Sequence, residues 1–221
     1  MRILCIGDSL GLPREGCSYE DTWIFLLKQK YPQHSFINSF TRRQLISEAL
    51  REYQNHTIHF KADVVILQQG ICDCSPRYVN DLLFVNRVIK WIFDKLNRTE
   101  LYWRIVKQTP RKQNCVYTKP DNFKRDYKCL IDSVLTAGGS IILIKIGHGS
   151  ESVQKSSPFY NSNVDKYNHI IDEIAKGYNK VYVVDPLNRV VDEMFVDGYH
   201  CNKVGMYKVY EELSCVIDKI A

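Results

Sequence analysis

The chain alternates short runs of apolar, mostly β-branched residues with longer segments in which apolar residues recur every three or four positions. The short runs predict five β-strands, at residues 3–6, 35–38, 64–67, 141–146 and 181–184. The periodic segments predict helices at residues 22–30, 41–50, 78–96, 122–137 and 164–175, and a last one after Asn202. Such alternation is typical of a parallel sheet covered by helices on both faces. The pattern predicts a three-layer, flavodoxin-like α/β fold with a five-stranded parallel sheet.

Local signals predict where some of these helices begin and end. Residues 41–44, Thr-Arg-Arg-Gln, have the pattern of a capping box, which predicts that Thr41 caps the helix that follows. The helix before Gly138 is expected to end there, because glycine is the preferred left-handed cap. Asn202 is expected to cap the last helix.

Length and composition favour one soluble domain over residues 1–221. The chain has 221 residues, 45% of them hydrophobic, which is enough to bury a core without disulfides or metals. No run approaches the roughly 20 apolar residues that a membrane span needs. Only two residues precede the first predicted strand, so a secretory signal of about 15–30 residues has no room. We expect a cytoplasmic protein without a membrane span.

The cysteines and histidines give no metal-binding pattern. The eight cysteines are scattered without a Cys-x-x-Cys pair, and Cys72-x-Cys74 has no second pair to complete a zinc site. We therefore expect reduced thiols rather than disulfides. His56 and His59 are three residues apart, but no acidic or cysteine partner lies nearby. The sequence predicts neither a metal nor a cofactor.

Residues from about 98 to 120 are the least regular part of the chain, and a basic cluster begins there. The overall charge is +5, and much of the basic excess lies in residues that are interleaved with aromatic ones: Arg104, Lys107, Arg111, Lys112, Lys119, Lys124, Arg125 and Lys128, with Tyr117, Phe123 and Tyr127. Nucleic acid, an anionic sugar polymer or a membrane surface would suit such a patch. No nucleic-acid-binding module surrounds it, and a solvated face explains it as well. We predict no nucleic-acid partner.

Two distant segments carry the residues of a nucleophilic site. Ser9 follows the first predicted strand directly, and Asp197 and His200 lie just before the last helix. A serine hydroxyl is a weak nucleophile until an imidazole accepts its proton and a carboxylate orients that imidazole. The C-terminal ends of strands in open α/β sheets are where ligand sites form. The spacing predicts that Asp197 and His200 face one cleft, because a tight turn can bridge them.

The segments Gly7-Asp8-Ser9-Leu10 and Asp197-x-x-His200 together resemble the motifs of the SGNH/GDSL hydrolases, in matching order over essentially the whole chain. The resemblance implies a flavodoxin-like fold, with Ser9 as nucleophile, His200 as general base and Asp197 orienting it. It also implies an oxyanion hole made by the Ser9 N–H, by a glycine amide after the second strand and by an asparagine after the third.

The two middle motifs depart from the family pattern. Residues 38–43 contain no glycine, so the amide of Thr41 or Arg42 would have to replace it. The Gly-x-Asn-Asp motif appears as Gly70-Ile71-Cys72-Asp73, and a thiol is a poor substitute for an amide donor. Losing one such donor costs about a hundred- to a thousandfold in rate.

Further residues are candidates for binding substrate. Arg77 follows the third motif within a turn, and Arg14 follows Pro13 after the serine block. Both Pro-Arg pairs resemble a subset of the family that is associated with surface polysaccharides. His148 follows the fourth strand at the same sheet edge and is a candidate for the substrate cleft. A pairing of Ser150 with a histidine is a weaker alternative, because no acid lies nearby.

We interpret the chain as a metal-independent serine esterase or acyltransferase that forms an acyl-enzyme on Ser9. The expected partner is a small-molecule or glycan ester, with a small acyl group such as acetyl. The alternative is a catalytically impaired member of the fold that binds a glycan or another anionic polymer, which Cys72 and the missing glycine favour. A nucleic-acid-binding protein that uses the basic patch is a third hypothesis.

Overall fold

A parallel sheet lies at the centre of the computed structural model, which describes residues 1–77, 83–108, 114–188 and 192–220. Within these ranges the strands are β1 (Arg2–Gly7), β2 (Ser35–Phe40), β3 (Val64–Gln68), β4 (Ser140–Ile144) and β5 (Val181–Val184). They pair in the order β2-β1-β3-β4-β5, and every pairing is parallel. The predicted five-stranded parallel sheet is confirmed, and the strand order is the flavodoxin-like one.

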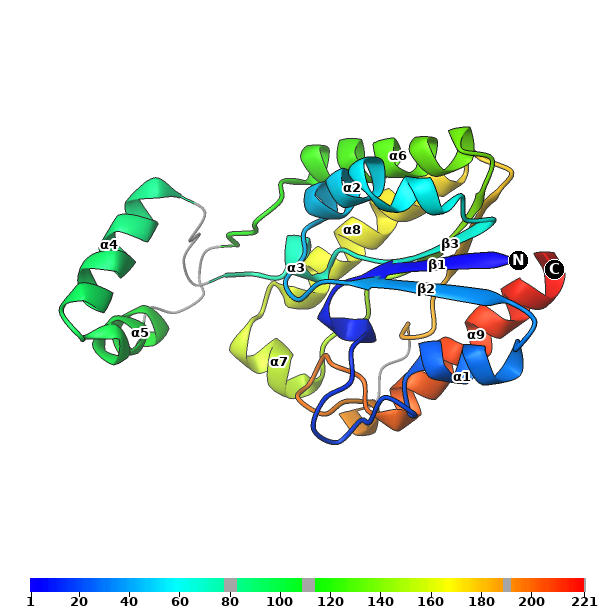
Figure 1. Ribbon diagram of the computed structural model, residues 1–221. Coiled ribbons are helices and arrows are strands. Elements are labelled where there is room, and N and C mark those ends of the chain that lie inside the picture. The colour runs from blue at the N-terminus through cyan, green and yellow to red at the C-terminus, as the bar shows by residue number, and fades with distance from the viewer. Residues whose placement is uncertain (78–82, 109–113, 189–191, 221) are drawn as a thin grey trace.

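Helices cover both faces of this sheet (Figure 1). One layer consists of α2 (Ile46–Asn55), α6 (Pro120–Thr136) and α8 (Tyr160–Ala175), and the other of α1 (Trp23–Lys30) and α9 (Lys203–Ile220). Leu67 of β3 packs in the core under α6 and α8, while its neighbour Ile66 packs in the core under α1 and α9. All five residues of β3 are buried, because a central strand of such a sheet faces a core on both sides.

Most of the predicted helix ends are confirmed. Asn202 Oδ1 accepts a hydrogen bond from the amide of Val204 at 2.9 Å, which caps α9. Gly138 follows α6 with φ +91°, the left-handed conformation expected of a glycine cap. The prediction for Thr41 is wrong. The helix begins at Ile46, and its capping contact runs from the Leu45 amide to Glu48 Oε2 at 2.8 Å.

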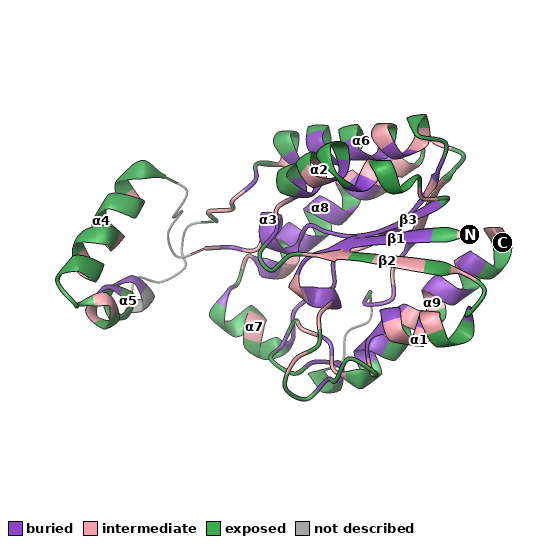
Figure 2. Cartoon of the chain, in the orientation of Figure 1, coloured by how far each residue is buried: buried purple, intermediate pink, exposed green. Residues whose placement is uncertain are grey.

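The helices α4 (Phe84–Lys95) and α5 (Thr99–Gln108) stand away from the sheet (Figure 1). Helix α4 lies within the predicted helix 78–96, of which residues 78–82, Leu82 among them, are outside the described residues. Its apolar residues do not enter a core: Phe84 is 78% exposed and Val85 is 65% exposed (Figure 2). Helix α5 also occupies part of the segment that was expected to be irregular.

The basic residues after residue 98 are divided between separate elements. Arg104 belongs to α5, which stands away from the sheet, whereas Lys124, Arg125 and Lys128 belong to α6, which covers one face of the sheet (Figure 1). Arg111 and Lys112 lie outside the described residues. The predicted patch is therefore not one continuous helical surface in the part of the chain that the structure describes.

Short elements follow the carboxyl ends of the strands and build one edge of the molecule. The 3-10 helix η1 (Ser9–Gly11) follows β1, α3 (Ile71–Cys74) follows β3, and α7 (Glu151–Ser156) follows β4. Two other 3-10 helices, η2 (Thr57–Phe60) and η3 (Asp192–Met194), precede β3 and α9. No helix within the described ranges is both long and apolar enough to cross a membrane. All eight cysteines are free thiols.

Candidate active site

Ser9 is the first residue of η1, just after the carboxyl end of β1, which lies between β2 and β3 in the sheet. Asp8 caps this turn, because its carboxylate accepts a hydrogen bond from the Leu10 amide at 2.9 Å. Gly7 precedes Asp8, and a Cβ atom at Gly7 would collide with the ring of Phe40 on β2. The contact of Gly7 with Phe40 and the hydrogen bond between Asp8 and Leu10 therefore fix the backbone conformation around Ser9.

Ser9, His200 and Asp197 form a continuous chain of contacts. Ser9 Oγ lies 3.1 Å from His200 Nε2, and His200 Nδ1 lies 2.7 Å from Asp197 Oδ2. The other carboxylate oxygen of Asp197 accepts a hydrogen bond from the His200 amide at 3.0 Å. This second bond fixes the turn, so the carboxylate holds the imidazole by its ring and by its backbone. The structure thus brings together three residues that are separated by up to 191 positions.

Burial and hydrogen bonds together set the protonation states of His200 and Asp197. Burial lowers the pKa of His200, while the hydrogen bond that its ring donates to Asp197 acts in the opposite direction. Burial also tends to raise the pKa of Asp197, but its hydrogen bonds with His200 outweigh this, and the pKa is lowered. At neutral pH, Asp197 is ionised and His200 is neutral, so that Nε2 can accept a proton from Ser9.

These three residues line a cavity of about 770 Å³. Of the other predicted residues, Arg14, Arg42, Cys72 and Arg77 also line it. The Arg14 guanidinium donates to the Ser9 carbonyl oxygen, and Arg77 Nη2 donates to the Cys72 carbonyl at 3.2 Å. Arg77 also lies over the ring of Tyr117, 4.4 Å from its centroid.

The turn after β2 differs from the expected arrangement. The Thr41 amide donates to the Gly7 carbonyl at 3.0 Å, so it is already used at the sheet edge, and Thr41 is not among the residues that line the cavity. Arg42 and Arg43 do line the cavity. Arg43 has φ +61°, a left-handed conformation that is uncommon for a residue with a side chain. The amides of Arg42 and Arg43 are therefore the remaining candidates on this turn.

Cys72 is almost buried beneath the cavity, with 7% of its surface exposed. Burial raises its pKa to about 12, so its sulfur is a neutral thiol and not a thiolate. It lies beside Asp8, whose pKa burial raises to about 7. A neutral thiol therefore lines the cavity near Ser9, and its role as a weak oxyanion donor stays a prediction.

Gly70 and Asp73 lie outside the set of cavity-lining residues. Gly70 has φ +127°, and a Cβ atom there would collide with Ile146. Asp73 is buried and accepts hydrogen bonds from the Ile46 amide at 3.2 Å and from Thr118 Oγ1 at 2.5 Å. Burial raises the pKa of Asp73 to about 7. Both residues position the turn that carries Cys72 and do not face the cavity.

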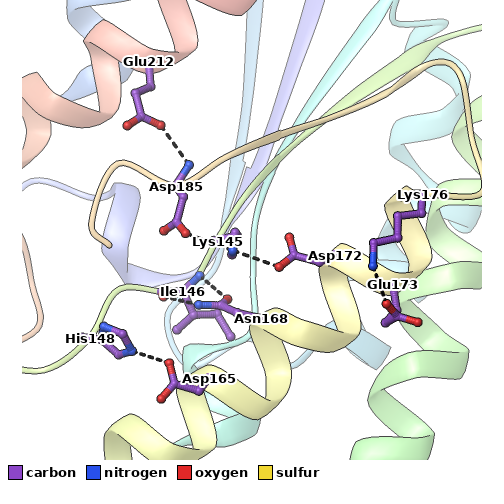
Figure 3. A network of polar contacts seen from close by, with 10 residues as sticks. All are labelled: Lys145, Ile146, His148, Asp165, Asn168, Asp172, Glu173, Lys176, Asp185 and Glu212. Atoms are coloured by element: carbon purple, nitrogen blue, oxygen red, sulfur yellow. Dashed lines mark hydrogen bonds and ion pairs between the residues drawn. The ribbon is translucent and has the colours of Figure 1, made fainter. Parts of the chain in front are cut away.

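His148 lies in a separate hollow of about 280 Å³, in contrast to the expectation that it lines the cleft. Its Nε2 lies 2.7 Å from Asp165 Oδ1 on α8 (Figure 3). The Ser150 hydroxyl has other partners. It lies 2.8 Å from the Ser152 hydroxyl and accepts a hydrogen bond from the Val153 amide. Across the described residues, no group of three or more histidine, cysteine or acidic side chains is arranged to hold a metal ion.

Several cavity residues were not predicted from the sequence. Tyr199 lies next to His200 in the chain, with 4.4 Å between the ring centroids, and Arg43 lies next to Arg42. Tyr199 and Arg43 could have been proposed from the sequence because each is next to a predicted site residue. Tyr160, Ser152 and Ser156 come from α7 and the start of α8, and no motif marked them.

Comparison with known proteins places the fold. No family model matches the chain, and no curated protein sequence matches it. A lipase/acylhydrolase from Enterococcus faecalis is similar over 98% of this chain and 95% of its own, with TM-score 0.68 and 15% identity. The acetyl xylan esterase AlAXEase is similar over 98% of this chain and 100% of its own, with TM-score 0.66 and 15% identity.

A third similar structure belongs to a member of the lipolytic protein G-D-S-L family from Veillonella parvula. It matches 98% of this chain and 97% of its own, with TM-score 0.63 and 14% identity. The chain therefore has the fold of the GDSL/SGNH lipolytic structures over nearly its whole length.

Proposed function

We propose that this protein is a serine ester hydrolase that forms an acyl-enzyme on Ser9. The observation that carries the proposal is the contact chain from Ser9 Oγ to His200 Nε2 at 3.1 Å and from His200 Nδ1 to Asp197 at 2.7 Å. A nucleophile, a base and an orienting acid within hydrogen-bond reach are the parts that acyl transfer needs. The fold shared with esterases and lipases supports the same chemistry.

The proposed reaction transfers a proton between Ser9, His200 and the substrate. His200 Nε2 removes the proton of Ser9 as Oγ attacks the ester carbonyl, and the carbonyl oxygen becomes an oxyanion. When the tetrahedral intermediate collapses, His200 gives that proton to the departing alcohol. Water then attacks the acyl-enzyme with His200 again as base, and His200 returns that proton to Ser9 Oγ as the bond to the acyl group breaks and the acid leaves.

Stabilisation of the oxyanion comes from the loops after three strands. The Ser9 amide and an amide of Arg42 or Arg43 supply backbone donors, and Cys72 supplies a thiol in place of an asparagine amide. Because S–H is a weak donor, this oxyanion hole is expected to be weaker than one with three strong donors.

A small acyl group, such as acetyl, on a carbohydrate is the substrate we favour. Tyr199 and Tyr160 both line the cavity, and aromatic rings beside the nucleophile suit the apolar face of a sugar. A similar structure is described as an acetyl xylan esterase. A sugar hydroxyl that replaces water would make the protein an acyltransferase, and analysis of the products distinguishes the two.

The test is the mass of the intact protein after incubation with a fluorophosphonate probe. Wild type should gain one adduct on the peptide that contains Ser9, and Ser9→Ala should gain none. Ser150→Ala is the matched control, a serine at the same sheet edge that should label like wild type. Equal labelling of wild type and Ser9→Ala would refute the nucleophile. No labelling of any form would favour a binding module without catalytic activity.

A further inference from the structure

Arginine side chains surround the cavity that contains Ser9. Arg14, Arg42, Arg43 and Arg77 line it, and Asp197 is its one acidic lining residue within the described part of the chain. Asp197 is already paired with His200. Since guanidinium groups stay protonated in proteins, the lining carries an excess of three positive charges.

None of these arginines is neutralised by the described part of the protein, where no carboxylate lies within ion-pairing distance of any of the four. The Nε atoms of Arg14 and Arg77 are buried and have no hydrogen-bond partner among the described residues. Among the described residues, another nitrogen of each guanidinium donates to a main-chain carbonyl, that of Ser9 for Arg14 and that of Cys72 for Arg77. A buried donor nitrogen without a partner is costly, so it is expected where a ligand supplies the acceptor.

Backbone strain adds an independent observation. Arg43 has φ +61°, a conformation that glycine adopts more readily. Such conformations are energetically unfavourable for a residue with a side chain, and they cluster at functional sites. A glycine at position 43 would remove the strain, but it would also remove a guanidinium group from the cavity. The strained conformation is therefore consistent with a role for the Arg43 side chain in the cavity.

We propose that the cavity binds an ester that carries an oxyanion, a carboxylate or a phosphate, and that the arginines of the cavity hold this group while Ser9 attacks the ester. This rests on the proposed function. Guanidinium groups bind planar or tetrahedral oxyanions through paired hydrogen bonds, and ions in solution screen partly buried pairs less than exposed ones. The substrate class is thus an acylated acidic compound, such as an acetyl ester of an acidic sugar.

The experiment compares esters that differ in charge. The substrates are 4-acetoxybenzoate, 4-acetoxyphenyl phosphate and the neutral methyl 4-acetoxybenzoate. For wild type we expect kcat/KM to favour one of the charged esters over the neutral one by about tenfold or more, mainly through KM, because each hydrogen bond to a charged group contributes that order of affinity. The preference should weaken with added salt, because ions screen the arginines. Carboxylate and phosphate arms show which oxyanion the cavity prefers.

Three variants locate the effect. Arg42→Gln and Arg43→Gly should each lower the charged-to-neutral ratio of kcat/KM by about fivefold or more, and Arg43→Gly keeps the backbone amide and relieves the strained φ. The control is Arg51→Gln, which removes an exposed arginine of α2 that does not line this cavity, and its ratio should equal that of wild type. A ratio near one in wild type, with the neutral ester still hydrolysed in a Ser9-dependent way, would overturn this inference and leave the proposed function standing.

Binding without turnover decides the inference if no ester is hydrolysed. Calorimetry with Ser9→Ala protein and 4-acetoxybenzoate or inorganic phosphate should detect binding of at least one of them that Arg77→Gln weakens by about tenfold. Arg77→Lys keeps the charge but not the paired donors, and should restore part of the affinity. Absence of binding by both anions would overturn the inference, whatever the result with the fluorophosphonate probe.

Discussion

Two histidine–aspartate pairs lie at the same edge of the sheet, and only one belongs to a site with the parts of a catalyst. His200 Nδ1 lies 2.7 Å from Asp197 Oδ2, and His148 Nε2 lies 2.7 Å from Asp165 Oδ1. His200 continues to Ser9, whereas the described surroundings of His148 show only its contact with Asp165 (Figure 3). We therefore expect only the pair that continues to a serine to take part in catalysis.

The polar groups around the two pairs differ in the same way. Near His148, Lys145 lies 3.0 Å from both Asp172 and Asp185, and Asn168 exchanges two hydrogen bonds with the backbone of Ile146 (Figure 3). These groups satisfy one another and attach α8 to the end of β4. Within the described ranges, the arginines around Ser9 have no carboxylate at ion-pairing distance. Mutual pairing indicates a structural role, and unpaired donors around a cavity indicate a ligand.

Removing the nucleophile or the base should reduce the rate of ester hydrolysis more than any other substitution. Such a loss would show that the pair of His200 and Asp197 belongs to the catalytic site. Ser9→Ala and His200→Ala should each reduce kcat/KM for 4-nitrophenyl acetate by about a thousandfold or more, because both are needed for one proton transfer. The double variant should be little worse than either single one. If hydrolysis survives His200→Ala largely intact, His200 is not the base.

The next largest effect is expected at Cys72. Cys72→Asn should raise kcat for the same ester by about tenfold or more, up to the roughly 3 kcal/mol of one oxyanion donor, because an amide donates better than a thiol. Cys72→Ala is the control and should change kcat little. The opposite pattern, with Cys72→Ala inactive and Cys72→Asn unimproved, would show that the thiol has a role of its own.

The dependence of kcat/KM on pH, measured with a neutral ester, should follow the ionisation of His200. The active form has a neutral imidazole, so kcat/KM should rise with pH and reach half its plateau below pH 6.5, since burial lowers the pKa of His200 from that value. Asp197→Asn removes the group that raises this pKa, so the midpoint should move further down in pH while the plateau falls. A midpoint above 6.5 in wild type would contradict the assignment of burial as the dominant influence.

His148→Ala should have the smallest effect. It lies outside the cavity of Ser9, so kcat/KM for a neutral ester should stay within about twofold of wild type, as is usual for substitutions away from a site. The same assay with Asp165→Asn provides a second measurement on the same pair. A loss of more than tenfold in either variant would show that the second pair takes part in the reaction, and the distinction between the two would have to be abandoned.

Local patterns in the sequence were sufficient to predict the sheet and the three residues of the contact chain. A central parallel strand must be apolar on both faces, so β3 could be recognised as a continuous run. Ser9 and His200 could be predicted as partners because strand ends of a parallel sheet meet at one edge, wherever they lie in the chain. The position of Thr41 was misjudged because a capping pattern does not show that its amide already bonds to Gly7.

Tertiary structure alone decided which charged residues face the cavity and which apolar faces are covered. The periodicity of α4 shows which residues share a face, but nothing in it shows that Val85 remains exposed. Arg14, Arg43 and Arg77 belong to three segments that are far apart in sequence, and their common surroundings follow from strand order and loop conformation. Periodicity and capping depend on neighbours within a few residues, whereas an unpaired charge or an uncovered face depends on what the rest of the chain brings next to it.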